Sequence, residues 1–507
     1  MRNTHSDIPE HTPEHRPLQG GARAASLKHV LKYTGIFGSV QVLQLLISVV
    51  RGKFTAVLIG TGGMGLSDLY HRTSELVSSA SNLGIAFSAV RRLAMLHEEG
   101  RRDEAEHYVC VVRSWMLLAA LLGAVLCLAC APWLSRIVAN EASGLADFRL
   151  LAPVVSLSII AAGEVAILKG AQQLRALAIN AVWTAVGTIV FTLPLYAFYG
   201  LRGIVPAMLA NAVLLLALQL RVSAHHFPWR ISFGRAFVGE GKQLLRLGMA
   251  YVVAGVVASG AEMLVRAFLI KTASLTEAGL YAVGLTLTVS YARMVFVAMD
   301  SDYFPRLSAT IDPFEMNRTV NRQIDVLVLL IAPFLIFFCL VLPFVVPLLY
   351  TSEFLQTIPM VLCAIFYMFF KAIYTPPAYL PLARGDAGLY MVMELTYNVV
   401  FATLVVVGYR AYGLAGAGVA LSVANFVDFL LITGIYSKRY GFRLAAATMR
   451  RSLLQFALLL CGVIAAWSQD AWIHWGAGGL ALAASATASC LLIKREGGIR
   501  FGRKSSK

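Results

Sequence analysis

Long apolar runs recur along the whole chain, and they constrain its fold more than any other feature of the sequence. Trp115–Pro132 and Val326–Val346 are two of them, and each is close to the ~20 residues that a helix needs to cross a bilayer. The composition agrees, because 58% of the 507 residues are hydrophobic and only 14% are charged, whereas soluble domains carry about 25% charged residues. The sequence therefore predicts an all-α integral membrane protein that crosses the membrane many times.

The apolar runs and the polar segments between them predict fourteen transmembrane helices. They lie near residues 31–59, 62–92, 110–138, 148–169, 176–199, 202–223, 244–270, 278–305, 325–349, 357–382, 388–411, 414–437, 451–467 and 472–493. Most of the 43 Lys and Arg residues fall in alternate connections and in the two terminal segments. Because basic loops stay on the cytoplasmic side of a membrane, we expect both termini in the cytoplasm.

The net charge of +16 has an explanation that needs no nucleic acid. Basic pairs such as Arg91-Arg92 and Lys438-Arg439 lie on the cytoplasmic side of this topology, where anionic membrane lipids attract them. Residues 1–28 are polar, contain three prolines and lack a cleavable apolar core, so we expect a disordered cytoplasmic tail. Residues 495–507 are expected to form a second, basic cytoplasmic tail.

The two halves of the chain resemble each other. Tyr199–Asn211 resembles Tyr412–Asn425, and the segment that begins at Arg51 resembles the one that begins at Arg266, at nearly the same offset. We therefore expect two six-helix bundles, related by a pseudo-twofold axis along the membrane normal, with a substrate site between them. The expected units are an N-terminal lobe (29–224), a C-terminal lobe (243–437) and helices 13 and 14 (450–494), which lie outside the repeat.

Charged side chains align on one face of the first two helices of each predicted lobe. The cations on these stripes are Arg51, Arg72, Arg266 and Arg293, and the acids are Asp68, Glu75 and Glu262. Charges that face lipid are costly, so the stripes are expected to line a water-filled cavity. We interpret the arginines as candidate substrate-binding residues and the three acids as candidate coupling carboxylates. The i, i+4 spacings Asp68–Arg72 and Glu262–Arg266 also fit ion pairs that only hold helices together, and this alternative stays open.

Other polar residues in apolar helices give weaker signals. Glu394 and Asp428 are single acids in such helices, which makes them candidates for a proton or sodium site. Lys371 shares one helix face with Tyr367 and Tyr374, and the pattern does not decide between a structural and a functional role.

Four short segments, taken together, resemble the O-antigen and polysaccharide flippases of the multidrug/oligosaccharidyl-lipid/polysaccharide exporter superfamily. They are LKYTGIFGSVQ from Leu31, VRGKFTAVLIGTGGMGL from Val50, SNLGIAFSAVRRLA from Ser81 and DYFPRLSA from Asp302. The resemblance implies two bundles arranged in a V, and alternating access. It also implies transport of an undecaprenyl-pyrophosphate-linked oligosaccharide, an O-antigen or exopolysaccharide repeat unit, across the bacterial inner (cytoplasmic) membrane. A polysaccharide polymerase and a chain-length regulator are the implied partners, and fourteen helices is a count shared with lipid II flippases.

The chemistry of the stripes agrees with such a substrate. A pyrophosphate is a compact anion, and a guanidinium group binds it through two hydrogen bonds while keeping its charge. Moving two negative charges outward across a negative-inside membrane gains roughly 4–5 kcal/mol per 100 mV.

Two other function classes compete with a flippase. A multidrug or small-solute antiporter of the same superfamily would favour carboxylates and aromatic residues in its cavity, whereas these stripes are rich in arginine. A membrane-embedded polysaccharide polymerase or glycosyltransferase would need a long outer loop or an acidic catalytic motif. The sequence shows no nucleotide-binding loop, metal-ligand cluster or nucleophile motif, so we expect a transporter with no catalytic residues, no metal and no cofactor.

Overall fold

The computed structural model of the protein is helical throughout the part of the chain that it describes. That part comprises residues 20–136, 145–231, 235–289, 296, 303–304, 306–310 and 312–497. Within it, 10 helices are long and apolar enough to cross a membrane, and the shorter apolar helix α8 (Leu275–Val289) accompanies them. The predicted all-α integral membrane fold is therefore confirmed.

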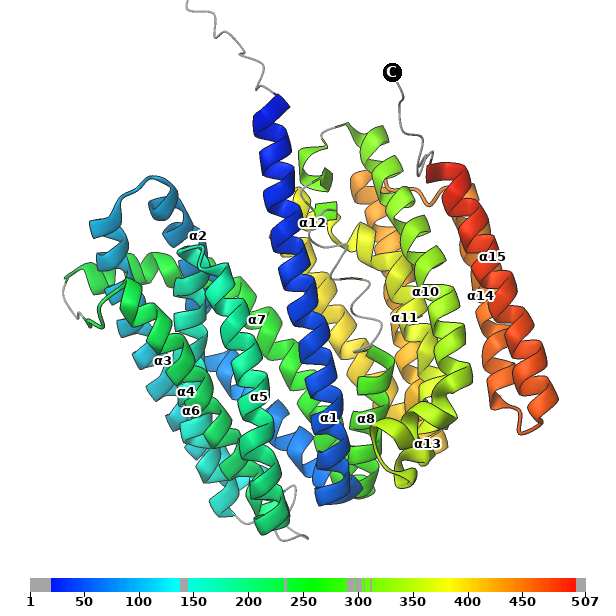
Figure 1. Ribbon diagram of the computed structural model, residues 1–507, viewed down its shortest axis with the longest axis horizontal. Coiled ribbons are helices and arrows are strands. Elements are labelled where there is room, and N and C mark those ends of the chain that lie inside the picture. Colours follow the sequence, from blue (N-terminus) through cyan, green and yellow to red (C-terminus); the bar gives the residue numbers. More distant parts are fainter. Residues whose placement is uncertain are drawn as a thin grey trace, which may run out of the picture.

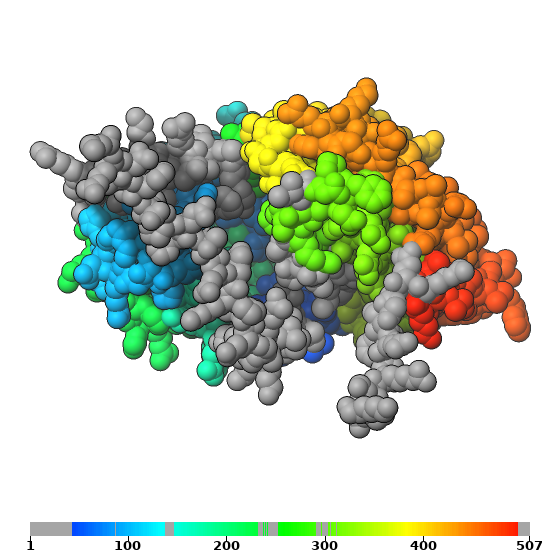
Figure 2. Space-filling model, turned by 90° about the horizontal axis from the view of Figure 1, so that it is seen from above, coloured from blue at the N-terminus to red at the C-terminus, as the bar shows by residue number. Residues whose placement is uncertain are grey.

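The helices fall into two groups that stand side by side. The first half of the chain supplies α1 (Gly20–Ser81), α2 (Ile85–Glu98), α3 (Arg102–Ser135), α4 (Leu145–Gly170), α5 (Leu174–Tyr199), the 3-10 helix η1 (Gly200–Gly203) and α6 (Ile204–His226). The second half supplies α7 (Arg235–Thr272), α8, α10 (Pro313–Leu349), η2 (Ser352–Thr357), α11 (Ile358–Ala378), α12 (Leu380–Ala383), α13 (Ala387–Tyr440), α14 (Ala446–Trp467), η3 (Ile473–Ala477) and α15 (Gly478–Gly497). Figure 1 shows α2–α6 on the left, α10–α15 on the right, and α7, α8 and the start of α1 between them. Seen from above in Figure 2, the same two groups occupy opposite ends of the molecule.

Two of the long helices, α1 and α13, are hairpins. α1 has 62 residues, which at 1.5 Å per residue would extend roughly 90 Å, about three times the ~30 Å hydrocarbon core of a bilayer. Non-helical backbone breaks α1 at Gly60 (φ 64°) and α13 at Gly413 (φ 59°), and glycine adopts such positive φ without strain. Figure 1 shows the chain reversing at both points at its lower end. We call residues 20–59 and 61–81 the first and second arms of α1, and residues 387–411 and 414–440 the arms of α13.

Several element boundaries differ from the predicted ones; α3, α7 and α10, for example, begin at Arg102, Arg235 and Pro313, ahead of the predicted starts. α1 begins at Gly20, so helix covers residues 20–28 of the segment expected to be a tail; this stretch is proline-free and alanine-rich, which favours helix. The second predicted helix is interrupted at Leu83 (φ 53°) and Gly84 (φ 67°) before the chain continues as α2. At the other end α15 continues to Gly497, past the predicted start of the basic tail.

Some predictions fall on residues outside the described part of the chain. These residues are 1–19, 498–507 and most of the predicted eighth helix beyond Val289. The count of fourteen helices therefore stays a prediction.

Each group of helices has its own apolar core. The core of the first group includes Val109 and Val155, and the larger core of the second group includes Ile331 and Ile365, all with no exposed surface. Burying such side chains stabilises each group by roughly 1.5–3 kcal/mol per side chain where water is the alternative; in lipid, close packing takes that role. A few residues join the two cores, such as Ala56 of α1 in the second and Met263 of α7 in the first, and the polar stripes lie where the two groups meet.

A buried arginine fixes the connection between the two groups. Arg113 and Glu164 form a two-pronged ion pair, with Nε–Oε1 at 2.8 Å, and both side chains are 1% exposed. The same guanidinium donates to the carbonyl of Pro228 at 2.9 Å and to the Ser223 hydroxyl at 2.8 Å, which secures the segment after α6. Glu164 is therefore a structural residue in the interior, since a buried carboxylate needs such a partner.

Candidate functional site

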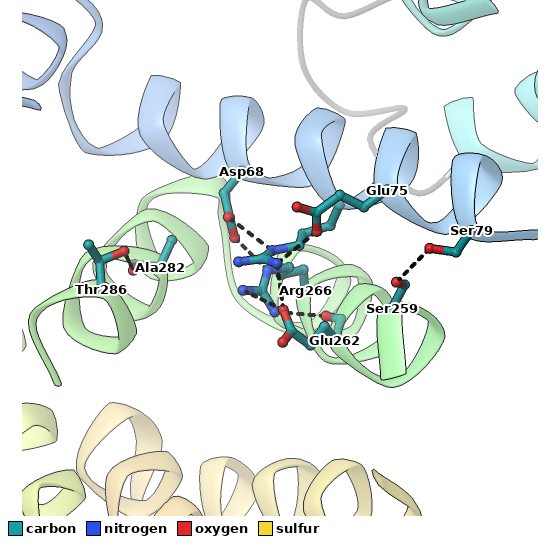
Figure 3. A network of polar contacts seen from close by, with 9 residues as sticks. Asp68, Glu75, Ser79, Ser259, Glu262, Arg266, Ala282 and Thr286 are labelled. Atoms are coloured by element: carbon teal, nitrogen blue, oxygen red, sulfur yellow. Dashed lines mark hydrogen bonds and ion pairs between the residues drawn. The ribbon is translucent and has the colours of Figure 1, made fainter. Parts of the chain in front are cut away.

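Five charged side chains meet between the second arm of α1 and α7, and we call them the charged cluster. They are Asp68, Arg72, Glu75, Glu262 and Arg266. Figure 3 shows the carboxylates of α1 pointing across to α7, and Arg266 and Glu262 of α7 pointing back between the two helices. The polar stripes that the sequence predicts on these helices therefore face each other.

Arg266 is the most buried member of the charged cluster, with a side chain that is 2% exposed. Its Nε lies 2.5 Å from Oδ2 of Asp68 on the other helix, and its Nη2 lies 3.5 Å from Oε2 of Glu262 on its own helix. Its Nη1 donates to the backbone carbonyl of Glu262 at 2.9 Å, and the ring of Tyr281 lies 5.7 Å from its guanidinium carbon. Arg266 is thus a fully paired interior cation.

Arg72 is more open, with a side chain that is 29% exposed. Its Nη1 lies 2.9 Å from Oε2 of Glu262 across the helix interface and 2.8 Å from Oε2 of Glu75 on its own helix. Its Nε lies 3.5 Å from Oδ1 of Asp68. Each arginine therefore makes a close ion pair with a carboxylate of the opposite helix, and its i, i+4 contact is the longer one.

The balance of charge in the cluster differs from the expected cationic cavity. Three carboxylates face two guanidinium groups, which leaves a formal excess of one negative charge. Carboxylates already lie against both guanidinium groups in this conformation, and such charge-assisted pairs are strong. A phosphate ligand would have to compete with these carboxylates.

A cavity of about 360 Å³ adjoins the cluster and contains a different arginine. Arg51 and His71 line it, together with Asp68, which borders both features. The Arg51 side chain is exposed, and among the described residues it has no hydrogen bond or ion pair. The Oδ1 atom of Asn211, another lining residue, is buried without a hydrogen-bond partner in that same set. The cavity therefore offers a ligand one guanidinium without an ion pair and one unsatisfied amide oxygen.

The remaining predicted site residue cannot be placed. Arg293 lies outside the described residues. The structure thus separates the three described arginines into two environments, with Arg72 and Arg266 paired in the charged cluster and Arg51 in the adjoining cavity.

Lys53, two residues after Arg51, has a structural role. Its ammonium group donates to the backbone carbonyls of Pro347, at 2.7 Å, and of Tyr350, at the end of α10. Cations stabilise the unpaired carbonyls at a helix C-terminus. Lys53 therefore joins the first arm of α1 to the second group of helices, at the lower end of the molecule.

Glycines bring α1 and α8 into close contact beside the cavity. A Cβ atom on Gly279 would lie 2.0 Å from the carbonyl oxygen of Thr61, and one on Gly65 would lie 2.2 Å from that of Leu275. Real Cβ contacts with backbone are never so short, so the two groups touch here only because both positions are glycine. The motif GTGGMGL contains Gly65, but the sequence alone does not reveal this partner helix.

The fold is similar to that of solved transporters of the MOP superfamily. The chain is similar to an inward-facing multidrug resistance MATE family transporter of that superfamily (TM-score 0.62, 13% identity, covering 80% of this chain and 96% of that one). It is also similar to the lipid II flippase MurJ in an inward closed conformation (TM-score 0.62, 13% identity, covering 92% and 99%). An outward-facing MATE family transporter gives a TM-score of 0.50 at 15% identity, over 80% of this chain and 98% of that one. At these identities the similarity is one of fold.

A family model described as "polysaccharide biosynthesis protein" matches residues 94–359, just over half of the chain. The protein therefore belongs to the polysaccharide biosynthesis protein family, and the resemblance drawn from its sequence is confirmed. A search of curated proteins finds no match.

Proposed function

We propose that the protein flips an undecaprenyl-pyrophosphate-linked oligosaccharide from the cytoplasmic to the periplasmic leaflet of the bacterial inner membrane. In this proposal two six-helix lobes, 29–224 and 243–437, alternate access to a site between them, and both termini are cytoplasmic. The upper end in Figure 1 is then the cytoplasmic end. The family and the fold support a transporter for polysaccharide synthesis, and the observation that carries the proposal is Arg51, an unpaired guanidinium in a cavity where the two groups meet.

In this proposal the charged cluster couples substrate binding to the separation of α1 from α7. Its closest ion pairs join α1 to α7, so separating these helices requires breaking them. A pyrophosphate bound at Arg51 would lie in the same cavity as Asp68 and would repel its carboxylate. This repulsion would weaken the ion pair between Asp68 and Arg266. A ligand that interacts differently with two conformations shifts the balance between them.

Removing the Arg51 guanidinium is expected to reduce flipping strongly. A hydrogen bond to a charged group contributes about 1.5–3 kcal/mol, so Arg51→Gln should lower transport roughly 10- to 100-fold. Arg51→Lys should restore only part of it, since an ammonium lacks the planar fork. Surface polysaccharide and the accumulation of lipid-linked intermediates inside the cell measure the effect. Arg149→Gln, which changes another exposed arginine, is the matched control, and normal surface polysaccharide in Arg51→Gln would refute the proposed role.

We also propose that a carboxylate of the charged cluster exchanges a proton during the cycle, with Glu262 first and Glu75 and Asp68 as alternatives. Protonation of Glu262 would remove the partner of Arg72 across the helix interface and loosen α1 from α7. In proteoliposomes, wild-type flipping should therefore depend on an imposed proton gradient, and Glu262→Gln should be slow and insensitive to it. Glu353→Gln, at an exposed position in η2, should behave as wild type. A Glu262→Gln protein that still responds to the gradient would exclude Glu262.

One observation favours a second candidate, an antiporter for cationic small molecules. The charged cluster carries one more negative than positive charge, and this excess would attract a cation. The two functions differ in a simple assay. A cationic-drug antiporter would change drug resistance and leave surface polysaccharide unaltered when the gene is deleted, whereas a flippase would do the reverse.

A further inference from the structure

A second polar cavity lies inside the second group of helices, away from the charged cluster. Its volume is about 220 Å³, and α11 and both arms of α13 enclose it. Six tyrosines line it, and we call it the tyrosine cavity: Tyr367, Tyr374, Tyr379, Tyr390, Tyr397 and Tyr436. Tyr379 directly follows α11, and Tyr436 lies one turn before the end of α13. The cavity is therefore in the upper half of the molecule in Figure 1.

Three charged side chains share the tyrosine cavity, and they do not neutralise one another. Asp428 is 6% exposed and, among the described residues, has no hydrogen bond or ion pair. Glu394 accepts a long hydrogen bond from Nδ2 of Asn398, at 3.4 Å. The ammonium of Lys371 makes one contact of 3.5 Å with the Tyr367 hydroxyl. Two acids and one base leave a formal charge of −1, and buried polar groups of this kind require partners.

The walls of the tyrosine cavity are held in place by a buried asparagine. Asn425, with no exposed surface, accepts a hydrogen bond from the Tyr374 hydroxyl at 3.0 Å. Its Nδ2 atom lies 3.3 Å from the Tyr397 hydroxyl. Two of the six rings are thus fixed from behind, and the hydroxyl of Thr375, which also lines the cavity, is buried without a partner within the described part of the chain. The site is preformed, as ligand sites commonly are.

The volume and the lining residues of the tyrosine cavity suit a sugar better than a metal ion. At about 30 Å³ per water it has room for roughly seven waters, far more than one cation occupies, and an ammonium group is already present. No group of three His, Cys, Asp or Glu residues converges on a metal position within the described residues. A pyranose combines apolar C–H faces, which pack on aromatic rings, with hydroxyls that donate to carboxylates and accept from an ammonium.

We propose that the tyrosine cavity binds one uncharged pyranose unit of the transported glycan; the choice of a glycan rests on the proposed function above. Asp428 and Glu394 accept hydrogen bonds from its hydroxyls, Lys371 donates one, and the tyrosine rings pack on its faces. The formal charge of −1 disfavours uronic acids. In the proposed orientation this half of the molecule is cytoplasmic, so the sugar is engaged before translocation.

The test uses the full-length protein in lipid nanodiscs and free monosaccharides. Saturation-transfer NMR with glucose, galactose and N-acetylglucosamine should show transfer to the ring protons of at least one of them, and none to glucuronic acid. Asp428→Asn and Glu394→Gln should each weaken that binding about tenfold, equivalent to ~1.4 kcal/mol. Glu353→Gln, outside the cavity, should bind as wild type. Thermal unfolding of each variant separates lost binding from lost folding, since neither substitution breaks an ion pair among the described residues and both should leave stability unchanged.

Each other outcome has a defined meaning. No transfer to any neutral sugar, or binding that persists unchanged in both variants, overturns the sugar site. Sodium binding that is lost in the same variants while sugars show no transfer would replace it with a cation site. If sugars bind as expected but Arg51→Gln flips normally, the tyrosine cavity stands and the proposed pyrophosphate site falls.

Discussion

Replacing Gly279 with alanine is expected to stop transport almost completely. The new methyl group would lie 2.0 Å from the carbonyl oxygen of Thr61, and a backbone atom cannot move aside as a flexible side chain can. Overpacking of this kind costs about 1–3 kcal/mol, and a rigid backbone neighbour places it at the upper end. The conformation in which α1 and α8 touch should become roughly 100-fold less populated. In the proposed alternating-access cycle the protein passes through this conformation at every turnover, so under that proposal lipid-linked intermediates should accumulate.

The same contact offers a matched pair of positions on α1. Gly65→Ala should act like Gly279→Ala, because its Cβ would lie 2.2 Å from the Leu275 carbonyl oxygen. Gly62→Ala should be nearly neutral, since its Cβ would lie 3.8 Å from the nearest side-chain atoms. Surface polysaccharide and membrane protein levels should be measured for all three. Equal activity in the Gly62 and Gly65 variants would show that the close approach is not needed for transport.

The second large effect is expected from Arg266, and it falls on stability. Arg266→Met removes a buried cation and leaves Asp68 and Glu262 without it, and breaking a buried pair in this way costs about 3–5 kcal/mol. A second change, Asp68→Asn, removes one of the two stranded charges and should recover a large part of the loss. Thermal unfolding of the purified protein measures both effects.

Arg72→Met is the control for Arg266, because its side chain is 29% exposed and shares the same carboxylates. Its ion pairs are partly solvated, so their loss should cost only about 0–1 kcal/mol. If the Arg72 and Arg266 variants unfold at the same temperature, burial does not distinguish the two arginines. If the double variant at 266 and 68 is no more stable than Arg266→Met, the stranded acid is not the cause.

The sequence predicts the helices well because each membrane-spanning helix needs a continuous apolar segment of about 20 residues, which is visible locally. It also predicts which face of each helix is polar, and Asp68, Arg72, Glu75, Glu262 and Arg266 all lie on those faces; their roles in substrate binding and coupling stay predictions. The 3.6-residue periodicity of a helix does not predict the distance between two facing helices or the depth at which each side chain is buried. For that reason the pairing of Arg266 with Asp68, 198 residues away, and the separate position of Arg51 appear only in three dimensions.

Three further features are not predicted from the sequence: the Arg113–Glu164 ion pair, the tyrosine cavity and the break at Leu83. Arg113 and Glu164 lie on different helices, and neither local pattern shows that the other is its partner. The tyrosine cavity draws its residues from α11 and the two arms of α13, and the sequence shows only a shared face for Lys371, Tyr367 and Tyr374. The interruption at Leu83 puts a non-glycine residue at positive φ, which propensity alone disfavours.

The charged cluster also sets an order of events during synthesis. Asp68, Arg72 and Glu75 enter the membrane early, and Arg266 follows 198 residues after Asp68. At a translation rate of about 5–20 residues per second, the first three wait roughly 10–40 s for their partner. During that interval Arg72 can pair with its two helical neighbours, at 3.5 and 2.8 Å in the finished fold, which leaves one negative charge unmatched. The nascent first half of the chain therefore keeps an unpaired negative charge until Arg266 of the second half pairs with it. A truncated chain that ends before α7 should accordingly be degraded by membrane quality control.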